Sequence, residues 1–392
     1  MYVFSSIEKR IFAFESDFCS FFMAGIYIHI PFCKTRCTYC DFHSGTNLQL
    51  KKQYIGALCN EIGLRKKYLE NQPVKTIYFG GGTPSLLTTE ELASVFDVLN
   101  RNFDLCQCEE VTLECNPDDL SEDYVYGLKR LPINRLSIGV QSFNDVELRF
   151  VNRRHSAQQA IEAVKRCQRC GFVNISVDLM FGLPFQTVDS FNENLRIVTQ
   201  LNVPHVSVYG LTFEQGTTID RQRKQKIFVP TDEEMSILMY ENAIQYLTSN
   251  GFEHYEISNF AKSGMRSKHN SSYWDGTHYL GIGSGAHSYN GVSRQWNVCD
   301  TRKYCLLRDY YEIETLSCED VYNELIITNL RRKEGVDLEF LLCRFGERFY
   351  RYCRKNAQQY LQNELLVLKN NRLCLTQKGL LLSDSVIRDL MI

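Results

Sequence analysis

Between Met23 and about residue 215, short β-rich runs alternate with helical patterns, and this alternation allows few architectures. The β-rich runs are Ile26–Ile30, Val74–Phe79, Glu109–Cys115, Asn134–Val140, Val173–Met180 and His205–Thr212. Helical patterns separate them at Leu48–Leu69, Thr89–Asn100, Ala157–Cys170 and Asp189–Leu201. Such alternation predicts parallel strands joined by crossover helices, and the nearly continuous apolar runs indicate strands covered on both faces. We therefore predict an α/β fold, a partial (β/α)6 barrel with functional groups at the carboxyl ends of its strands.

The remainder of the chain divides into three further regions. We predict a poorly ordered extension over residues 1–22, with Met23 as the working start, and the barrel over 23–250. The barrel region includes an exposed excursion, Gln215–Pro230, and a helix over Thr231–Asn250 that begins with a cap signature at Thr231 and stops at Gly251. An extension of the barrel follows over 251–300, with little periodicity in Lys262–Tyr289. Helices and two short strands over 301–392 predict a winged-helix-like domain.

Composition excludes several classes of protein. The 392 residues carry a formal charge of −2, which argues against a nucleic-acid binder with a broad basic face. No apolar run reaches the roughly 18 residues that span a bilayer, and charged residues interrupt the first 22 residues, so no export signal is predicted. We therefore expect a cytoplasmic protein, where thiols stay reduced. The 16 cysteines then favour metal ligation or plain burial over disulfides.

Three of the cysteines are closely spaced at the end of the first predicted strand. Cys33, Cys37 and Cys40 form a C-x3-C-x2-C run. Three thiolates on one loop can bind three corners of an iron–sulfur cube, whereas a structural zinc site would want a fourth ligand. Neither Asp41 nor Phe42 is a soft ligand, so a fourth iron would stay open to substrate or cofactor. Three buried cysteines without metal remain the alternative.

This spacing resembles that of radical S-adenosylmethionine (SAM) enzymes. The segments Tyr27–Cys33, Tyr78–Pro84, Gly139–Phe143 and Asp178–Pro184 are typical of the coproporphyrinogen-oxidase-like branch of that family. The resemblance runs from about Tyr27 to the C-terminus and implies a TIM-like radical SAM barrel. It also implies a 4Fe-4S cluster and SAM, with one-electron chemistry supplied by a donor such as flavodoxin or ferredoxin.

The resemblance also implies which residues contact SAM. The glycine run after the second strand lets backbone approach a ligand closely, and Glu114 ends the third strand. The residues implied for a first SAM are Tyr27, Tyr39, Gly81, Gly82, Thr83 and Glu114. Gln141, Arg153 and Asp178 match positions that hold a second SAM in oxygen-independent coproporphyrinogen dehydrogenases.

A second motif lies in the barrel extension. His269, Asn270, Tyr273 and Trp274 are similar to the H-N-x-x-Y-W motif of HemW-type heme chaperones. An imidazole can bind heme iron, Asn270 can orient it, and the two aromatics can lie against a porphyrin face. A packed histidine beside aromatics is the plainer interpretation. Among the other histidines, His287 is the next candidate.

Two departures separate the chain from the dehydrogenases of the branch. Their fourth cysteine, two residues past the third, is replaced here by Phe42, and the N-terminal region differs from theirs, which is normally longer and ordered. We therefore predict a heme chaperone that binds heme and transfers it to an acceptor apo-hemoprotein. The prediction allows peripheral contact with a membrane and includes no nucleic-acid partner. An oxygen-independent coproporphyrinogen III dehydrogenase is the first alternative. A SAM-dependent RNA-modifying enzyme is the second, kept open by the cations Arg331–Lys333.

Overall fold

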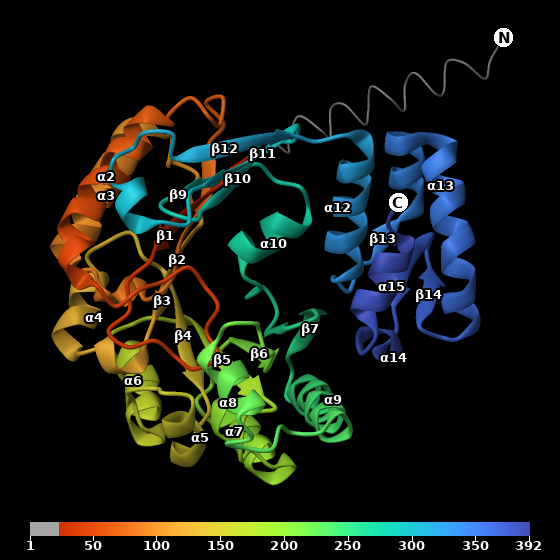
Figure 1. The fold of residues 1–392 in the computed structure, drawn as a ribbon, viewed down its shortest axis with the longest axis horizontal. Coiled ribbons are helices and arrows are strands. Elements are labelled where there is room, and N and C mark those ends of the chain that lie inside the picture. The colour runs from red at the N-terminus through yellow and green to blue at the C-terminus, as the bar shows by residue number, and fades with distance from the viewer. Residues whose placement is uncertain (1–22) are drawn as a thin grey trace.

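The computed structural model describes residues 23–392, and its centre is a curved sheet of parallel strands (Figure 1). Six strands run parallel and neighbour one another in chain order. They are β1 (Ala24–Ile30), β2 (Val74–Gly81), β3 (Glu110–Cys115), β4 (Arg135–Gln141), β5 (Asn174–Phe181) and β6 (His205–Gly210). The predicted partial (β/α)6 barrel is confirmed. The predictions for residues 1–22 lie outside the described part of the chain.

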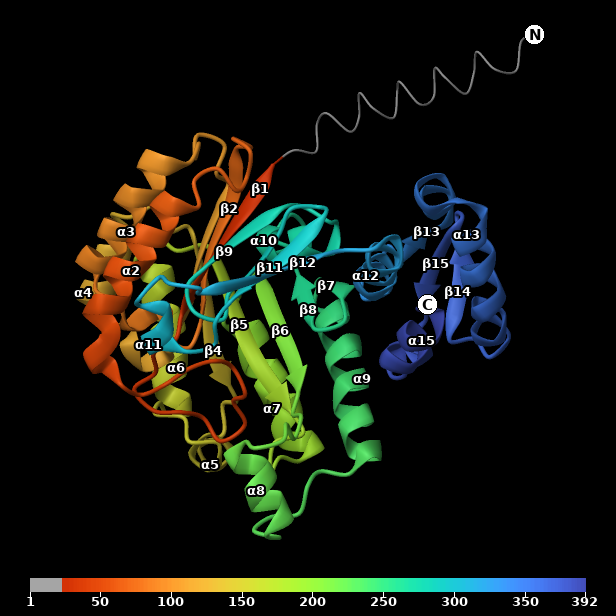
Figure 2. The same ribbon diagram turned by 45° about the horizontal axis from the view of Figure 1, so that its top comes forward.

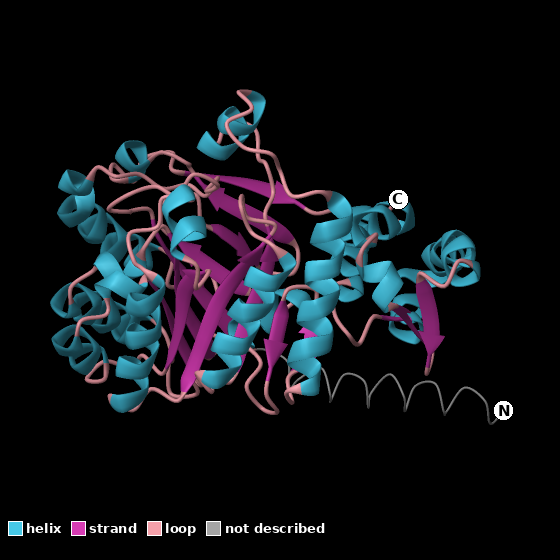
Figure 3. Cartoon of the chain, turned by 90° about the horizontal axis from the view of Figure 1, so that it is seen from below, coloured by secondary structure: helices cyan, strands magenta, loops and turns pink. Residues whose placement is uncertain are grey.

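Helices cover the outer side of these strands (Figures 2 and 3). They are α2 (Lys51–Leu64), α3 (Thr89–Asn102), α4 (Glu122–Leu128), α5 (Asp145–Phe150), α6 (Ala157–Arg169) and α7 (Val188–Gln200). Sequence caps set several boundaries: the Thr88 hydroxyl accepts from the Glu91 amide, while the Glu91 side chain accepts from Thr88. No helix in residues 23–392 combines the length and the hydropathy needed to cross a membrane.

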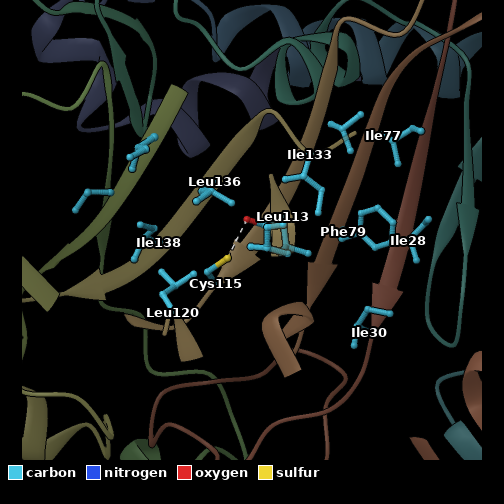
Figure 4. Close-up of a cluster of buried hydrophobic side chains, with 14 of the residues drawn as sticks. Ile28, Ile30, Ile77, Phe79, Leu113, Cys115, Leu120, Ile133, Leu136 and Ile138 are labelled. Atoms are coloured by element: carbon cyan, nitrogen blue, oxygen red, sulfur yellow. Dashed lines mark hydrogen bonds between the residues drawn. The ribbon is translucent and has the colours of Figure 1, made fainter. Parts of the chain in front are cut away.

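Alternate residues of each strand face the helices and form the core (Figure 4). On β1, Ile28 and Ile30 pack on this side with Phe79 and Leu113, and all four are fully buried. Because successive side chains of a strand point to opposite faces, Tyr27 and His29 of β1 face the inside of the barrel. The core therefore fixes which side chains reach the interior.

The sheet continues beyond the barrel at both edges, and within residues 23–392 it has twelve strands. A helix, α9 (Glu233–Ser249), precedes β7 (Glu253–Glu256) and β8 (Asn259–Ala261), which join antiparallel beyond β6. α9 begins later than the cap signature predicts, because Asp232 caps it by accepting from the Met235 amide at 2.7 Å. At the other edge, β9 (Tyr279–Ile282) pairs parallel with β1. The antiparallel strands β10 (His287–Tyr289), β11 (Ser293–Asn297) and β12 (Tyr311–Thr315) follow.

Short helices accompany these edge strands. They are α8 (Thr218–Lys224) in the exposed excursion, α10 (Lys268–Trp274) and α11 (Thr301–Tyr304). α10 and the four-residue β9 lie in the region where the sequence shows little periodicity. Elements of this length are too short to show a repeating pattern.

A smaller C-terminal domain with its own hydrophobic core is present, as predicted. Its elements are α12 (Cys318–Leu330), β13 (Val336–Asp337), α13 (Leu338–Gln362), β14 (Leu366–Lys369), β15 (Arg372–Leu375), α14 (Gln377–Leu380) and α15 (Ser383–Leu390). Its three strands form an antiparallel sheet in the order β13-β15-β14. Gly346, at φ 79°, interrupts the helical backbone inside α13.

Candidate functional site

The cysteine loop follows β1 and is tied to the barrel on several sides. Cys33, Cys37 and Cys40 are all free thiols. The backbone amide of Thr38 donates to the Val151 carbonyl at 3.2 Å, and the Ile219 amide of α8 donates to the Thr38 carbonyl at 2.9 Å. The loop between the cysteines is therefore held by α5 and α8 rather than left free.

Polar side chains surround two of the three sulfurs. The Thr83 hydroxyl donates to the Cys33 Sγ at 3.5 Å, and Arg153 Nη1 donates to the Cys37 Sγ at 3.4 Å. Asn116 links these donors, because its amide nitrogen donates to Thr83 Oγ1 at 3.3 Å and its oxygen accepts from Arg153 at 2.7 Å. Burial raises the pKa of Cys33 and of Cys40, and the nearby cations Arg153 and Arg36 partly oppose these rises.

The loop suits a cluster better than a single ion. Cys33, Cys37 and Cys40 are three soft ligands on this one loop, and neither Asp41 nor Phe42 supplies a fourth. A structural zinc site normally has four ligands, whereas three thiolates can each bind a different iron of an iron–sulfur cube. The donors at Thr83 and Arg153 would stabilise charge on cluster sulfur ligands. The residues present thus fit a 4Fe-4S cluster.

The glycine run brings the end of β2 against this loop. The Gly82 amide donates to the Ile30 carbonyl at 2.8 Å, and a Cβ at Gly82 would lie 2.8 Å from the Phe32 carbonyl oxygen. Gly81 adopts φ 110°, which favours glycine, and its amide donates to Glu114 Oε2 at 3.0 Å. The glycines therefore permit close approach of two backbones and hold Glu114 in place.

Glu114 lies inside the barrel among other polar groups. Its second oxygen accepts from the Tyr78 hydroxyl at 2.8 Å, and the Tyr78 ring stacks on Tyr27 with centroids 6.1 Å apart. Burial raises the pKa of Glu114 to about 7, and the hydrogen bond from Tyr78 partly opposes this rise. The site predicted for a first SAM thus gathers Tyr27, Thr83, Glu114 and the two glycines near the cysteine loop.

The residues predicted for a second SAM follow on neighbouring strands. Gln141 ends β4 at φ 69° beside a register shift between β4 and β5, an unusual backbone for a residue with a side chain. Asp178 of β5 accepts from Ser137 and Ser176, and burial raises the pKa of its carboxyl. Arg153 also donates to the Gly139 carbonyl, yet its buried Nε has no partner within residues 23–392. Such an orphaned donor fits a polar ligand such as a carboxylate. Tyr39, predicted for the first SAM, packs against a small apolar group that includes Val151 and Met180.

The predicted heme motif forms α10 and holds it against β2 and β3. His269 is fully buried, with Nδ1 hydrogen-bonded to the Thr76 hydroxyl at 2.8 Å and Nε2 to the Tyr273 hydroxyl at 2.9 Å. Its ring stacks on Tyr78, and burial lowers its pKa to about 3. Both ring nitrogens are engaged inside the protein. Within residues 23–392 the Asn270 side chain makes no hydrogen bond to His269, so Thr76 and Tyr273 orient the imidazole.

A cavity of about 410 Å³ opens beside the cysteine loop. Its lining comes from the cysteine loop, β1, α10 and the β9–β11 region: Tyr27, His29, Asp41, Phe42, His43, Tyr273, Tyr279, Gly285, His287 and Cys299. Four of these are phenyl or phenol rings and three are imidazoles, a mixture suited to a flat aromatic ligand with a metal. Tyr273 of the motif reaches this cavity, whereas His269 lies behind it.

The sequence did not predict a role for several residues at this site. Thr76, Asn116, His43, Tyr279 and Cys299 have roles only because the fold places them beside the predicted residues. His43 carried one usable signal, since it follows the third cysteine by three residues. Tyr279 and Cys299 had none, because they come from edge strands and loops far along the chain.

Comparisons with known proteins bear on the family and the fold of this chain. Residues 27–198 match the Radical SAM superfamily, and residues 316–382 match the HemN C-terminal domain. The heme chaperone HemW of Lactococcus lactis subsp. lactis (strain IL1403) is 34% identical over 364 residues, which cover 92% of this chain and 95% of the relative. The heme chaperone HemW of Bacillus subtilis (strain 168) is 36% identical over 379 residues, covering 93% and 98%. The solved structure of coproporphyrinogen III oxidase (HemN) from Escherichia coli has the same fold, with a TM-score of 0.82 and 24% identity over 94% of this chain and 90% of that one.

Proposed function

The chain belongs to the HemW family of heme chaperones, and from this premise we propose that it binds heme and passes it to an acceptor hemoprotein. One observation carries the proposal. Asp41, Phe42 and His43 directly follow the third cysteine and line the aromatic and histidine-rich cavity. The same short segment therefore belongs to the cluster loop and to a site of the right chemistry for a porphyrin.

The radical SAM superfamily implies a 4Fe-4S cluster and SAM, and we assign their contacts to this chain's residues. Cys33, Cys37 and Cys40 would hold the cluster, with Thr83 and Arg153 donating to two of the sulfurs. When bound, the cluster and SAM supply one-electron chemistry. Tyr27, Tyr39, Gly81, Gly82, Thr83 and Glu114 would contact a first SAM, and Gln141, Arg153 and Asp178 a second. The motif residues His269, Asn270, Tyr273 and Trp274 would contribute to the heme site.

The alternatives gain less support. Phe42 stands where the dehydrogenases carry a further cysteine, and it is 64% exposed at the cavity. A large apolar side chain in that place suits contact with a porphyrin face better than ligation. For an RNA-modifying enzyme, Arg331–Lys333 would have to be available, but these cations pair with Asp384, Glu334 and Glu253, respectively.

We propose that the one-electron donor, an acidic protein such as flavodoxin or ferredoxin, docks at α8. The excursion Gln215–Pro230 contains four cations and one acid. Its helix touches the cysteine loop through the bond from Ile219 to Thr38. A positive surface next to the cluster loop would steer an acidic donor to the electron acceptor. We propose the cytoplasm as the location, where a chain with this many cysteines would keep its thiols reduced.

Anaerobic heme titration tests the proposed function. Reconstituted protein should bind hemin with a Soret band at a stoichiometry of about one and release it to an apo-hemoprotein. The same protein, given coproporphyrinogen III, SAM and a reductant, should yield no protoporphyrinogen. Formation of protoporphyrinogen would replace the chaperone with the dehydrogenase, and absence of hemin binding would remove the proposal.

A further inference from the structure

Three histidines line the cavity, and two of them already hold protein groups. His29 is engaged at both nitrogens, by the Tyr27 hydroxyl at 3.1 Å and the His43 carbonyl at 2.8 Å. His43 is held through Nε2 by the Ser284 hydroxyl at 3.1 Å. Ligation of iron by either residue through these nitrogens would break hydrogen bonds that support the cysteine loop and the neighbouring glycine loop.

His287 differs from both. Its side chain is exposed in the cavity, and within residues 23–392 neither ring nitrogen has a hydrogen-bond partner. Its ring stacks on Trp296, with centroids 6.2 Å apart and an interplanar angle of 30°. The two residues face each other across the antiparallel pair β10–β11. The indole thus supports one face of the imidazole and leaves its nitrogens open.

Hydrogen bonds hold the backbone segment that leads to His287. The Gly283 amide donates to Glu61 at 2.9 Å, and the Ser284 amide donates to the Tyr54 hydroxyl at 2.9 Å. Glu61 is fully buried in α2 and also accepts from Tyr304 and Asn297. A Cβ at Gly283, where φ is 106°, would lie 2.5 Å from the Tyr54 oxygen. Because Gly283 and Ser284 are fixed in this way, the loop restrains the position of His287 before any ligand arrives.

We propose that His287 is the axial ligand to the heme iron. The porphyrin would lie in the cavity between the cysteine loop and His287, whose ring stacks on Trp296. This assignment rests on the proposed function. Tyr27, Phe42, Tyr273 and Tyr279 supply aromatic surface for the macrocycle. Asp41–His43 place the heme next to the predicted cluster, so cluster and heme would share one wall.

The motif residue His269 then has a positioning role. Its Nε2 holds the Tyr273 hydroxyl, and Tyr273 in turn packs edge-on against Tyr279 at 4.7 Å between ring centroids. Both tyrosines line the cavity. Loss of His269 would therefore loosen a wall of the heme site without removing the iron ligand.

Substitution of each histidine separates these roles. We expect His287→Ala to shift the Soret band of bound ferric heme and to weaken hemin affinity by about tenfold or more. Free imidazole should restore the band position in this variant, because it can occupy the vacated place. We expect His269→Ala to lower the affinity while leaving the band unmoved. His287→Gln, with unchanged cluster iron and far-UV circular dichroism, provides a second variant in which a folding defect is excluded.

Matched variants identify the competing ligands. His43→Ala and Cys299→Ala should leave the band in place. An unmoved band and unchanged affinity in both His287 variants would overturn the assignment, as would a shifted band in His43→Ala, Cys299→Ala or His269→Ala. Failure of the unsubstituted protein to bind hemin is a different result, since it removes the proposed function itself.

Discussion

At the scale of single residues, the interior of the barrel holds polar groups that an apolar core would exclude. Glu114 and Asp178 both have carboxyl pKa values raised by burial, and each is held by hydrogen bonds from neighbouring strands. Buried carboxyl groups with shifted pKa values cluster at ligand-binding and catalytic sites of proteins. These side chains therefore mark the barrel interior as the working face of the molecule.

The raised pKa of Glu114 predicts a pH dependence of stability in the cofactor-free protein. The folded state keeps a proton on this carboxyl between the ordinary value of 4.5 and about 7, whereas the unfolded state does not. The unfolding free energy should therefore fall as the pH rises through this range, by up to about 3 kcal/mol from this group. Urea unfolding at pH 5 and pH 7.5 should show this loss, and Glu114→Gln should reduce it. Equal pH slopes for the two proteins would contradict the shift.

At the scale of elements, the loops and short helices at the carboxyl ends of the strands carry most of the proposed chemistry. The cysteine loop, α8, α10 and the loop before β10 are each held by hydrogen bonds to other elements. Elements this short are not stable by themselves, so their geometry depends on those contacts. This explains why a sequence motif predicts that such a loop or short helix exists but not which residues it contacts.

The position of α8 makes charge reversal there a test of donor docking. Arg221→Glu with Lys226→Glu leaves Arg223 and Lys224 paired with Asp220, so the helix itself should persist. Reduction of the cluster by flavodoxin at low salt should slow by about tenfold, and the effect should shrink at high salt. Stopped-flow absorption measures this rate. Reduction by dithionite serves as the internal control, because it needs no docking protein.

A matched pair of substitutions checks that the effect is local. The double variant Arg348→Glu and Arg351→Glu changes the net charge of the protein by the same amount as the α8 variant. Its two substitutions lie on α13 of the C-terminal domain, where both side chains are largely exposed. This variant should be reduced by flavodoxin at the normal rate. An equal slowing in both variants would indicate net charge rather than a docking site at α8.

At the scale of the whole molecule, two hydrophobic cores are joined by a polar seam. The barrel core and the C-terminal core share no residues. Between them, Arg266 pairs with Glu253 and Glu334 at 2.8 Å, and the Ile257 amide donates to the Arg331 carbonyl at 3.1 Å. Partly exposed ion pairs add little stability, so the cores should respond separately to perturbation.

Removal of the cluster should therefore destabilise only one of the cores. The cysteine loop contacts α5 and α8 of the barrel, so chelating the iron from reconstituted protein should lower the barrel's thermal midpoint by roughly 5 °C or more. Both tryptophans, Trp274 and Trp296, lie on the barrel side, and tryptophan fluorescence therefore follows that core alone. The Cys33/Cys37/Cys40 triple alanine variant should show no change on chelation. A shift in that variant would mean that the cluster is held elsewhere.

The sequence by itself determined the local features of this protein. Alternating periods predicted β1 to β6 and the helices α2, α3, α6 and α7, but not the shorter α4 and α5. The spacing of Cys33, Cys37 and Cys40 predicted the cluster loop. Both are readable because neighbouring residues carry the pattern. Sequence motifs also identified Glu114 and His269, although not the residues that each one contacts.

Only the tertiary structure decided the environment of those residues. His269 belongs to a motif that can be recognised in the sequence. The fold nevertheless buries it between Thr76 and Tyr273, and both of its ring nitrogens are hydrogen-bonded there. His287 has no motif of comparable length, and the pairing of β10 with β11 and the contacts of Glu61 leave it open at the cavity beside the cysteine loop. Contacts between residues more than two hundred positions apart depend on how the sheet is ordered, and no local pattern records that order.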